Sequence, residues 1–376
     1  MRIKALLLGA AMLLAAAEPA FSQTTVPAEL TAQPMAVGVV GLTHDHVGNI
    51  FNSEKRGDIK IVGIAEPDRA LAQKYADRYG FSMDIVYPDM ATMMDKTHPV
   101  AVTGFDSIAE HVDIVRAAAP RGIHVMVEKP LAFTMKDATE MEGLAKKYHI
   151  QLLTNYETTW YPTLEQSKAM VDAGQIGPVR KMVFHDGHQG PATIGVSKEF
   201  LSWLTDPQKN GGGALIDFGC YGANLMTWLT EGARPVAVTA VTRHFQPETY
   251  PKVDDDATIV VDYPKAQGIA QASWDWPVGR KDMEVYGTTG QIVTDNKHDM
   301  RVWGSAPESV AASTLPDRPY PFDDSNSYFR AVIEGRVTPP PYDPSSLENN
   351  MLVVEILDAA RKSAATGKTV KLSAHP

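Results

Sequence analysis

The stretch "AVGVVGLTHDHVGNIF", residues 36–51, predicts the start of a nucleotide-binding domain. Its apolar beginning predicts a buried strand, Gly41 follows at once, and a helix is expected near 45–54. A dinucleotide-binding turn of the G-x-G-x-x-G type that begins at Gly41 would have two further glycines, at positions 43 and 46. The chain has Thr43 and His46 there, so only the first glycine of the turn is kept.

Side chains of this turn could replace part of the missing phosphate contact. Thr43 can offer its hydroxyl, and His44 and His46 can offer a hydrogen bond or a positive charge. The N-terminus of the following helix attracts an anion without any glycine. The histidines could instead lie on the surface beside a loop, or bind a metal as a pair. A His-x-His sequence with one acid is weak grounds for a metal, so we expect no metal site.

Residues 36–155 alternate strands with helices, which indicates a parallel sheet covered by helices on both faces. Glu66 ends the second strand, about 25 residues after Gly41, where dinucleotide-binding domains keep an acid for the ribose hydroxyls. A carboxylate there repels a 2′-phosphate, which favours NAD over NADP as the cofactor. The alternative is a solvated acid at a strand end.

The pattern changes after Tyr156. A helix near 162–173 and a glycine-rich stretch precede β-rich segments with hairpin-like spacing, which predicts a largely antiparallel sheet. The tail predicts an amphipathic helix that ends near Gly367. The expected fold is an α/β Rossmann-like domain over 35–155, followed by an α+β domain with a large, mostly antiparallel sheet over 156–376.

The beginning of the chain has the features of a secretory signal peptide. Arg2 and Lys4 precede a short apolar run, and small residues stand before Gln23, which predicts cleavage after residue 22 and a linker over 23–34. An uncleaved anchor is the alternative. No other apolar run could cross a bilayer, so we expect no membrane insertion of the mature chain. The protein is expected in the periplasm or outside the cell.

Composition excludes further classes of partner and site. Cys220 is the only cysteine, so neither an intrachain disulfide nor a cysteine-ligated metal can form. The formal net charge is −10 and no basic block is present, so no nucleic-acid partner is expected.

Two motifs carry groups suited to catalysis. "MVEKPLAFT" places Glu128 and Lys129 where a parallel strand ends, at the sheet edge where ligands bind in such folds. In "GGGALIDFGCYGANLMTWL", Asp217, Tyr221 and Asn224 follow at helical spacing and would share one helix face. A surface lysine before a turn proline, and a helix cap with ordinary packing, are the alternatives.

Together these motifs resemble the Gfo/Idh/MocA oxidoreductase superfamily from residue 36 to about 370. "VEKPLAFT" is similar to the family's E-K-P signature, and the glycine-rich stretch is similar to its D-x-G-x-H-x-x-D motif. Tyr221 replaces the expected histidine and Asn224 the second acid. The tyrosine resembles the glucose–fructose oxidoreductase branch, which is also exported.

The resemblance implies Lys129, Asp217 and Tyr221 as catalytic residues. Tyr221 would be the acid or base, Lys129 would lower its pKa, and Asp217 would hold the reacting hydroxyl. The site residues given to the cofactor are Gly41, Thr43, His44, His46, Glu66, His111, Glu128 and Lys129, and those given to the substrate are Asn224, Trp160 and Trp274. Core packing or an oligomer interface is the alternative for the aromatic residues.

The expected function is hydride transfer between nicotinamide and a sugar or cyclic polyol, by an exported NAD(P)-dependent oxidoreductase. In the family the large sheet often forms the oligomer interface, so a homodimer or homotetramer is expected. One alternative is a redox-neutral, NAD-dependent glycosidase of the same superfamily. Another is a sugar-binding protein that has lost its cofactor.

Overall fold

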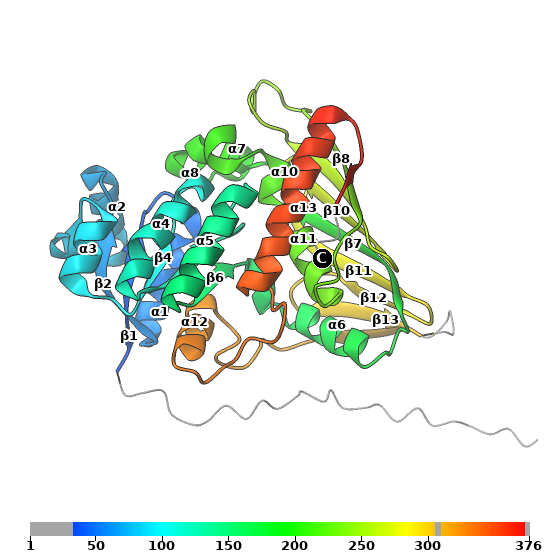
Figure 1. The fold of residues 1–376 in the computed structure, drawn as a ribbon, viewed down its shortest axis with the longest axis horizontal. Helices are drawn as coiled ribbons and strands as arrows, with labels where there is room; N and C mark the ends of the chain where they lie inside the picture. The colour runs from blue at the N-terminus through cyan, green and yellow to red at the C-terminus, as the bar shows by residue number, and fades with distance from the viewer. Residues whose placement is uncertain (1–32, 305–309, 373–376) are drawn as a thin grey trace, which may run out of the picture.

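The computed structural model describes residues 33–304 and 310–372. The predicted signal peptide and most of the predicted linker lie outside this part of the chain. Two bodies, each built on a sheet, lie side by side (Figure 1). Within the described residues, no helix combines the length and apolar character needed to cross a bilayer.

The first body is built on a six-stranded parallel sheet with the strand order β3-β2-β1-β4-β5-β6. Its strands are β1 (Met35–Val40), β2 (Ile59–Ala65), β3 (Val86–Tyr87), β4 (Ala101–Gly104), β5 (His124–Glu128) and β6 (Leu152–Asn155). Its α-helices are α1 (Gly48–Arg56), α2 (Arg69–Tyr79), α3 (Met90–Thr97), α4 (His111–Ala118) and α5 (Met135–Tyr148), with short 3₁₀ turns η1 (Asp45–Val47), η2 (Met83–Ile85), η3 (Ile108–Glu110), η4 (Ala119–Arg121) and η5 (Glu157–Trp160).

Local sequence sets the ends of these helices. The side chains of Asp68, Asp89 and Thr134 each accept backbone N–H groups at the starts of α2, α3 and α5. α1 and α2 each end at a glycine with positive φ, Gly57 and Gly80. The predicted alternation of strand and helix is present, and the structure adds β3 and α3, which were not predicted.

The second body is a nine-stranded sheet with the order β14-β13-β12-β11-β7-β10-β9-β8-β15, in which only the β7–β10 pair is parallel. Its strands are β7 (Val179–Gly187), β8 (Ala237–Arg243), β9 (Asp256–Asp262), β10 (Gln267–Ser273), β11 (Arg280–Gly287), β12 (Gln291–Thr294), β13 (Asp299–Trp303), β14 (Val310–Thr314) and β15 (Val370–Lys371). The fold class predicted from the sequence is confirmed.

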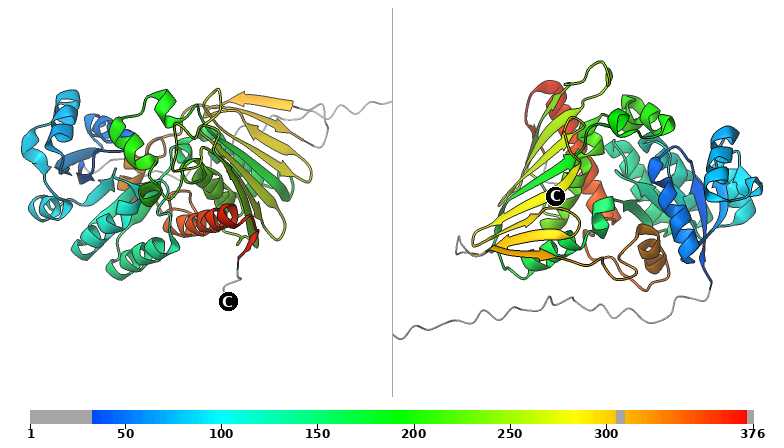
Figure 2. Two further views of the ribbon diagram at one scale, coloured as in Figure 1. Left: turned by 90° about the horizontal axis from the view of Figure 1, so that it is seen from above. Right: turned by 180° about the vertical axis from the view of Figure 1, so that it is seen from behind.

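Helices cover one face of this sheet and leave the other face without a helix from the described residues (Figure 2). The helices that follow the first body are α6 (Pro162–Asp172), α7 (Pro191–Ile194), α8 (Lys198–Leu204), α9 (Pro207–Asn210), α10 (Ala214–Asp217), α11 (Gly219–Leu229), α12 (Ser325–Ile333) and α13 (Leu347–Thr366). Every residue of α11 is buried, because this helix lies between the sheet and α13.

The last two helices return to the first body (Figure 1). Tyr328 and Phe329 of α12 belong to the hydrophobic core that contains α1, α2 and one face of the parallel sheet. α13 contributes side chains to the hydrophobic cores of both bodies. Val353 packs in the core of the second body, and Val354 packs in the core of the first. The sequence did not predict this return of the chain.

The packing of α12 predicts a large loss of stability when Phe329 is shortened. Phe329→Ala removes a fully buried ring and is expected to lower the free energy of unfolding by about 3–5 kcal/mol. Phe245, whose exposed fraction is 57%, is the matched control, and Phe245→Ala should change it by less than about 0.5 kcal/mol. Urea denaturation measures both; equal effects would contradict the packing described here.

Candidate active site

An ion pair between the two bodies is at the centre of the site. Lys129 follows the last residue of β5, and its Nζ donates to Oδ1 and, at 3.0 Å, to the backbone oxygen of Asp217. Both side chains are about 7% exposed. Burial opposes charge on each group, but the partner's opposite charge outweighs it: the pKa of Lys129 is raised and that of Asp217 lowered. The pair is therefore ionised at neutral pH.

The structure corrects the predicted helix around Asp217. The chain does not form one helix through Asp217, Tyr221 and Asn224: α10 ends at Asp217, and α11 starts at Gly219. The N–H of Tyr221 donates to Phe218, and the oxygen of Asp217 instead accepts from Lys129 and from the Cys220 thiol. The lysine thus binds a carbonyl that a continuous helix would have used.

Tyr221 lies beside this pair but differs from the expectation in its acidity. Nζ of Lys129 is 5.2 Å from the centroid of its ring, and the ring of Tyr156 meets it edge-on at 5.5 Å. The phenol is 1% exposed, and burial, together with the carboxylates of Glu157 and Asp217, raises its pKa well above the usual value. The prediction of a lowered pKa for Tyr221 is wrong, because burial of the phenol and the nearby carboxylates raise its pKa.

A second charged group near Tyr221 was not predicted. Nζ of Lys281, on β11, lies 4.8 Å from the Tyr221 ring centroid and pairs with Glu157. The Tyr161 hydroxyl donates to the other oxygen of Glu157 at 2.6 Å. Asp186 on β7 is buried nearby, opposite Lys281 in the strand register, and burial raises its pKa well above the usual value.

Three residues predicted to contact the substrate have packing roles. Asn224 is fully buried and donates to the oxygens of Pro344 and Asn349, so it joins α11 to the start of α13 and does not line the site. Trp274 is fully buried, and its Nε1 donates to Oδ2 of Asp217 at 2.9 Å. It orients the carboxylate and offers no free face to a sugar.

The observed contacts of Trp160 are with Asn155 and with helix α12. Its Nε1 donates to Oδ1 of Asn155 at 3.2 Å, and its ring packs on Tyr328 of α12 with centroids 5.4 Å apart. Its neighbour Tyr161 faces the charged residues instead. A single sequence pattern could not separate these two adjacent aromatic residues.

The glycine of the first turn has a backbone conformation that favours glycine. Gly41 has φ of +78°, and a β-carbon there would lie 1.8 Å from Oδ1 of Asp106. Glu66, at the end of β2, accepts from the N–H groups of Leu42 and Asp68 at 3.0 and 2.8 Å. The acid expected to bind ribose therefore also braces the turn.

The rest of the turn differs from a pyrophosphate-binding turn. The N–H of His44 donates to Phe105, and that of His46 to Nδ1 of His44. The Thr43 hydroxyl donates to Phe105 as well, at 3.3 Å. Of the two histidine rings, that of His44 is almost fully buried. These groups are paired within the protein rather than directed at a ligand.

The segment between β7 and α10 covers this turn. His44 packs on Phe200 and Trp203 of α8, with ring centroids 4.3 and 5.6 Å apart. The N–H of Ser197 donates to Asp45 at 2.9 Å, and Lys74 pairs with Glu199. α8 therefore closes the carboxyl edge of the parallel sheet at the first turn.

The remaining predicted cofactor residues are also buried. His111, at the start of α4, lies with its Nδ1 3.2 Å from the oxygen of Leu131, and burial lowers its pKa to about 4. It supports the loop after Lys129. Glu128 pairs with His46 at 3.0 Å, and although burial opposes its charge, His46 lowers its pKa to about 2.

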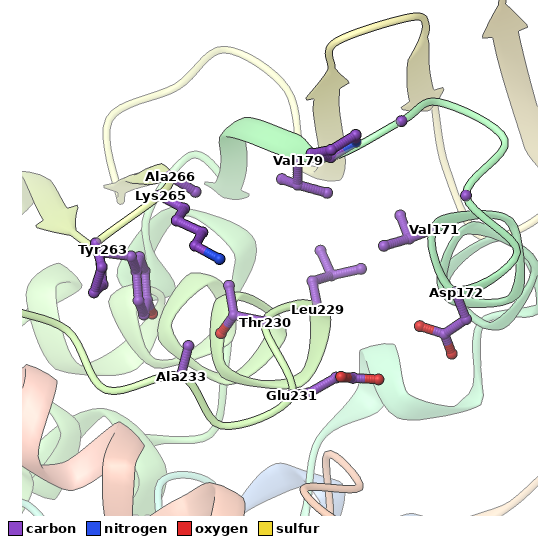
Figure 3. Close-up of a pocket in the computed structure, with 14 residues that line it drawn as sticks. Val171, Asp172, Val179, Leu229, Thr230, Glu231, Ala233, Tyr263, Lys265 and Ala266 are labelled. Carbon is purple, nitrogen blue, oxygen red and sulfur yellow. The ribbon is translucent and has the colours of Figure 1, made fainter.

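A cavity of about 720 Å³ lies away from these residues, at the ends of α6 and α11 (Figure 3). Val171, Leu229 and Tyr263 form its apolar wall, with Glu231 and Lys265 at its sides. None of the predicted site residues lines it. A site chosen by cavity volume alone would therefore not contain the predicted site residues.

Comparisons with known proteins define the family. Residues 35–156 match the model of the oxidoreductase family with an NAD-binding Rossmann fold, and residues 164–293 match the GFO/IDH/MocA C-terminal domain. These matches cover well over half of the chain, which therefore belongs to the Gfo/Idh/MocA oxidoreductase family. The predicted family and the predicted NAD(P)-binding Rossmann domain are confirmed.

Two curated relatives illustrate the similarity. A trans-1,2-dihydrobenzene-1,2-diol dehydrogenase of Xenopus tropicalis is 28% identical over 55% of this chain and 58% of its own length. A D-xylose 1-dehydrogenase (NADP(+)) of Haloferax volcanii is 24% identical over 90% of this chain and all of its own. The chain thus spans little more than half of the first relative.

Solved structures share the fold. An inositol dehydrogenase homologue of Azotobacter vinelandii complexed with NAD+ superposes with a TM-score of 0.78 at 20% identity, over 91% of this chain and 98% of its own. An aldose-aldose oxidoreductase of Caulobacter crescentus complexed with glycerol gives 0.76 at 23% identity, over 90% of this chain and all of its own.

The residues present suit binding of the family's dinucleotide at two places. At a third place they differ from the usual dinucleotide-binding turn. The bare backbone of Gly41 and the carboxylate of Glu66 suit the ribose end, and Lys129 stands at the strand end that faces the second body. The turn of His44 and His46 is the altered part, because its N–H groups have internal partners.

The ion pair predicts a non-additive effect on stability. Lys129→Met leaves the buried Asp217 carboxylate unpaired and is expected to lower the free energy of unfolding by about 3–5 kcal/mol. The double variant with Asp217→Asn should lose less than this single variant. Lys362→Met is the control, since its pair with Asp358 is exposed and is worth about 1 kcal/mol or less. Chemical denaturation tests this; additive losses would contradict it.

Asp106 predicts a pH dependence. Burial, with Glu110 and Glu66 nearby, raises the pKa of Asp106 to about 8, against about 3.9 in the unfolded chain. The folded protein binds the extra proton between these values, so this group lowers stability as pH rises toward 8. Asp106→Asn should gain stability over the wild type between pH 5.5 and 8.5 in urea denaturation. Asp95→Asn, at an acid whose pKa is lowered by Arg121, should show no such gain.

Proposed function

We propose that this protein is an exported NAD(P)-dependent oxidoreductase that acts on a sugar or cyclic polyol. The observation that carries the proposal is the buried Lys129–Asp217 pair at the carboxyl end of β5, in a chain of the Gfo/Idh/MocA family. The names of its relatives, a xylose dehydrogenase and an inositol dehydrogenase homologue, support the substrate class. Export is supported by the signal-peptide pattern of residues 1–22.

Bound nicotinamide would accept or donate the hydride. Glu66 and Gly41 would hold the ribose end, and Lys129 would border the reacting end. Lys129 is positively charged, so it can donate a hydrogen bond to the substrate oxygen and stabilise negative charge that develops there. Asp217 keeps the lysine charged and in place, and Trp274 holds the carboxylate.

Tyr221 would act as a neutral phenol. Its raised pKa makes the phenol a weak acid, so its hydroxyl can donate a hydrogen bond but rarely gives up its proton at neutral pH. The pKa of Lys129 is raised as well, so Lys129 is assigned the stabilisation of negative charge on the substrate oxygen and not the proton transfer. Tyr221→Phe should accordingly cost less turnover than Lys129→Met.

An oligomer is part of the proposal. The outer face of the nine-stranded sheet carries partly exposed side chains that alternate with buried ones along β9 and β10. A second copy of the chain could cover this face. The glycosidase and the binding-protein alternatives lack a specific observation in their favour.

The first experiment looks for the cofactor. Mature protein is denatured and the released small molecules are analysed for NAD(H) and NADP(H) by mass spectrometry, and NADH binding is followed by fluorescence. Aldoses and inositols are then screened for dinucleotide reduction. A protein that neither contains nor binds a dinucleotide would refute the proposal.

The active-site variants give a quantitative prediction. Lys129→Met should lower kcat/KM by about 10²–10³-fold, because the positive charge that stabilises the developing negative charge on the substrate oxygen is lost. Lys362→Met, far from the site, should keep the wild-type value. Unchanged kcat/KM in a folded Lys129→Met protein would contradict the assignment.

A further inference from the structure

The turn that lacks two glycines holds a group of potential metal ligands. Among residues 33–304 and 310–372, His44, His46 and Glu128 are the one set of three whose ligand atoms lie within 4.8 Å of one another. We propose that they bind a divalent transition-metal ion, such as Zn²⁺ or Fe²⁺, through two imidazoles and one carboxylate. The proposal goes beyond the oxidoreductase function and does not depend on it.

The fold brings a third potential ligand, Glu128, to the two histidines of the turn. Glu128 ends β5, 82 residues after His46, and its Oε2 lies 3.0 Å from Nδ1 of His46. With metal–ligand bonds of about 2.0–2.2 Å, two ligand atoms at this separation meet at one ion in a roughly right-angled arrangement. The two histidine rings have centroids 4.4 Å apart, so the third ligand is close as well.

A metal ion binds neutral imidazoles and an ionised carboxylate, so its binding would release any proton held between His46 and Glu128. Lys129, the neighbouring cation, is paired with Asp217 and leaves the charge of Glu128 available.

Other side chains hold these ligands in place. Nδ2 of Asn155 donates to Oε1 of Glu128 at 2.9 Å, which orients the carboxylate. Phe200 and Trp203 pack against the ring of His44 and hold it in place. Nδ1 of His44 accepts the N–H of His46 at 3.1 Å, and a metal–nitrogen bond would replace that one hydrogen bond.

A small polar cavity adjoins the group. His46, Glu128 and Thr103 are among its lining residues, and its volume of about 10 Å³ is enough for one water. Thr103 is 1% exposed, and its hydroxyl has no hydrogen-bond partner among the described residues. Two histidines and a carboxylate leave coordination positions open, and this cavity can hold the water that completes them.

The chain offers an internal control for an ordinary histidine–carboxylate pair. Nδ1 of His185 lies 3.0 Å from Oδ2 of Asp282, the same separation as in the His46–Glu128 pair. No third histidine, cysteine or acid completes a metal-binding group there among the described residues. The two pairs differ in the presence of His44.

Co²⁺ is the probe for the test. Protein freed of metal by chelation and gel filtration is titrated with Co²⁺ in the absence of dinucleotide, and the visible d–d absorption gives stoichiometry and affinity. We expect one ion per chain. His46→Gln and Glu128→Gln should each weaken binding by about 100-fold or more, since even outer contacts of a metal site contribute 10–100-fold. His185→Gln should bind Co²⁺ as the wild type does.

Two results would overturn the proposal: no saturable Co²⁺ absorption in the wild type, or wild-type absorption in His46→Gln. The side chain of His46 is 33% exposed, so this variant is expected to fold, and circular dichroism checks that it does. NADH fluorescence, measured on the same samples, reports the oxidoreductase proposal separately. Failure of one measurement leaves the other unaffected.

Discussion

The buried ion pair between Lys129 and Asp217 is the interaction on which the arrangement of the site depends. Each charge has lost most of its water, so neither residue could stay ionised without the other. The lysine comes from the end of a parallel strand in the first body, and the aspartate from a short helix in the second. The pair thus forms only when both bodies are folded and in contact, and it orders the residues around Tyr221.

The sequence predicted the parts of this molecule that depend on local pattern. The alternation of apolar strands and capped helices gave the parallel sheet, and the E-K-P motif gave Lys129 at its edge. The prediction that Asp217, Tyr221 and Asn224 share one helix face was wrong. Lys129 binds the backbone carbonyl of Asp217, which a continuous helix would have used. A contact with a residue 88 positions away decided that local structure.

The Glu157–Lys281 pair could not be predicted from the sequence, for the same reason. Glu157 and Lys281 are 124 residues apart, and only the register of β11 on β7 brings the lysine to Tyr221. Neither residue was singled out as a candidate site residue. Trp274 and Asn224 were chosen for their chemistry, but burial determines what they contact. Spacing along the chain carries no information on burial of this kind.

The helix α13 has a consequence for the order of folding. Its neighbouring residues Val353 and Val354 complete two different cores, and the helix begins only at Leu347. During synthesis, neither core can close its last surface until the ribosome has passed this point. The growing chain therefore exposes apolar surface on both bodies until α13 has been synthesised, and a chaperone has that long to engage it.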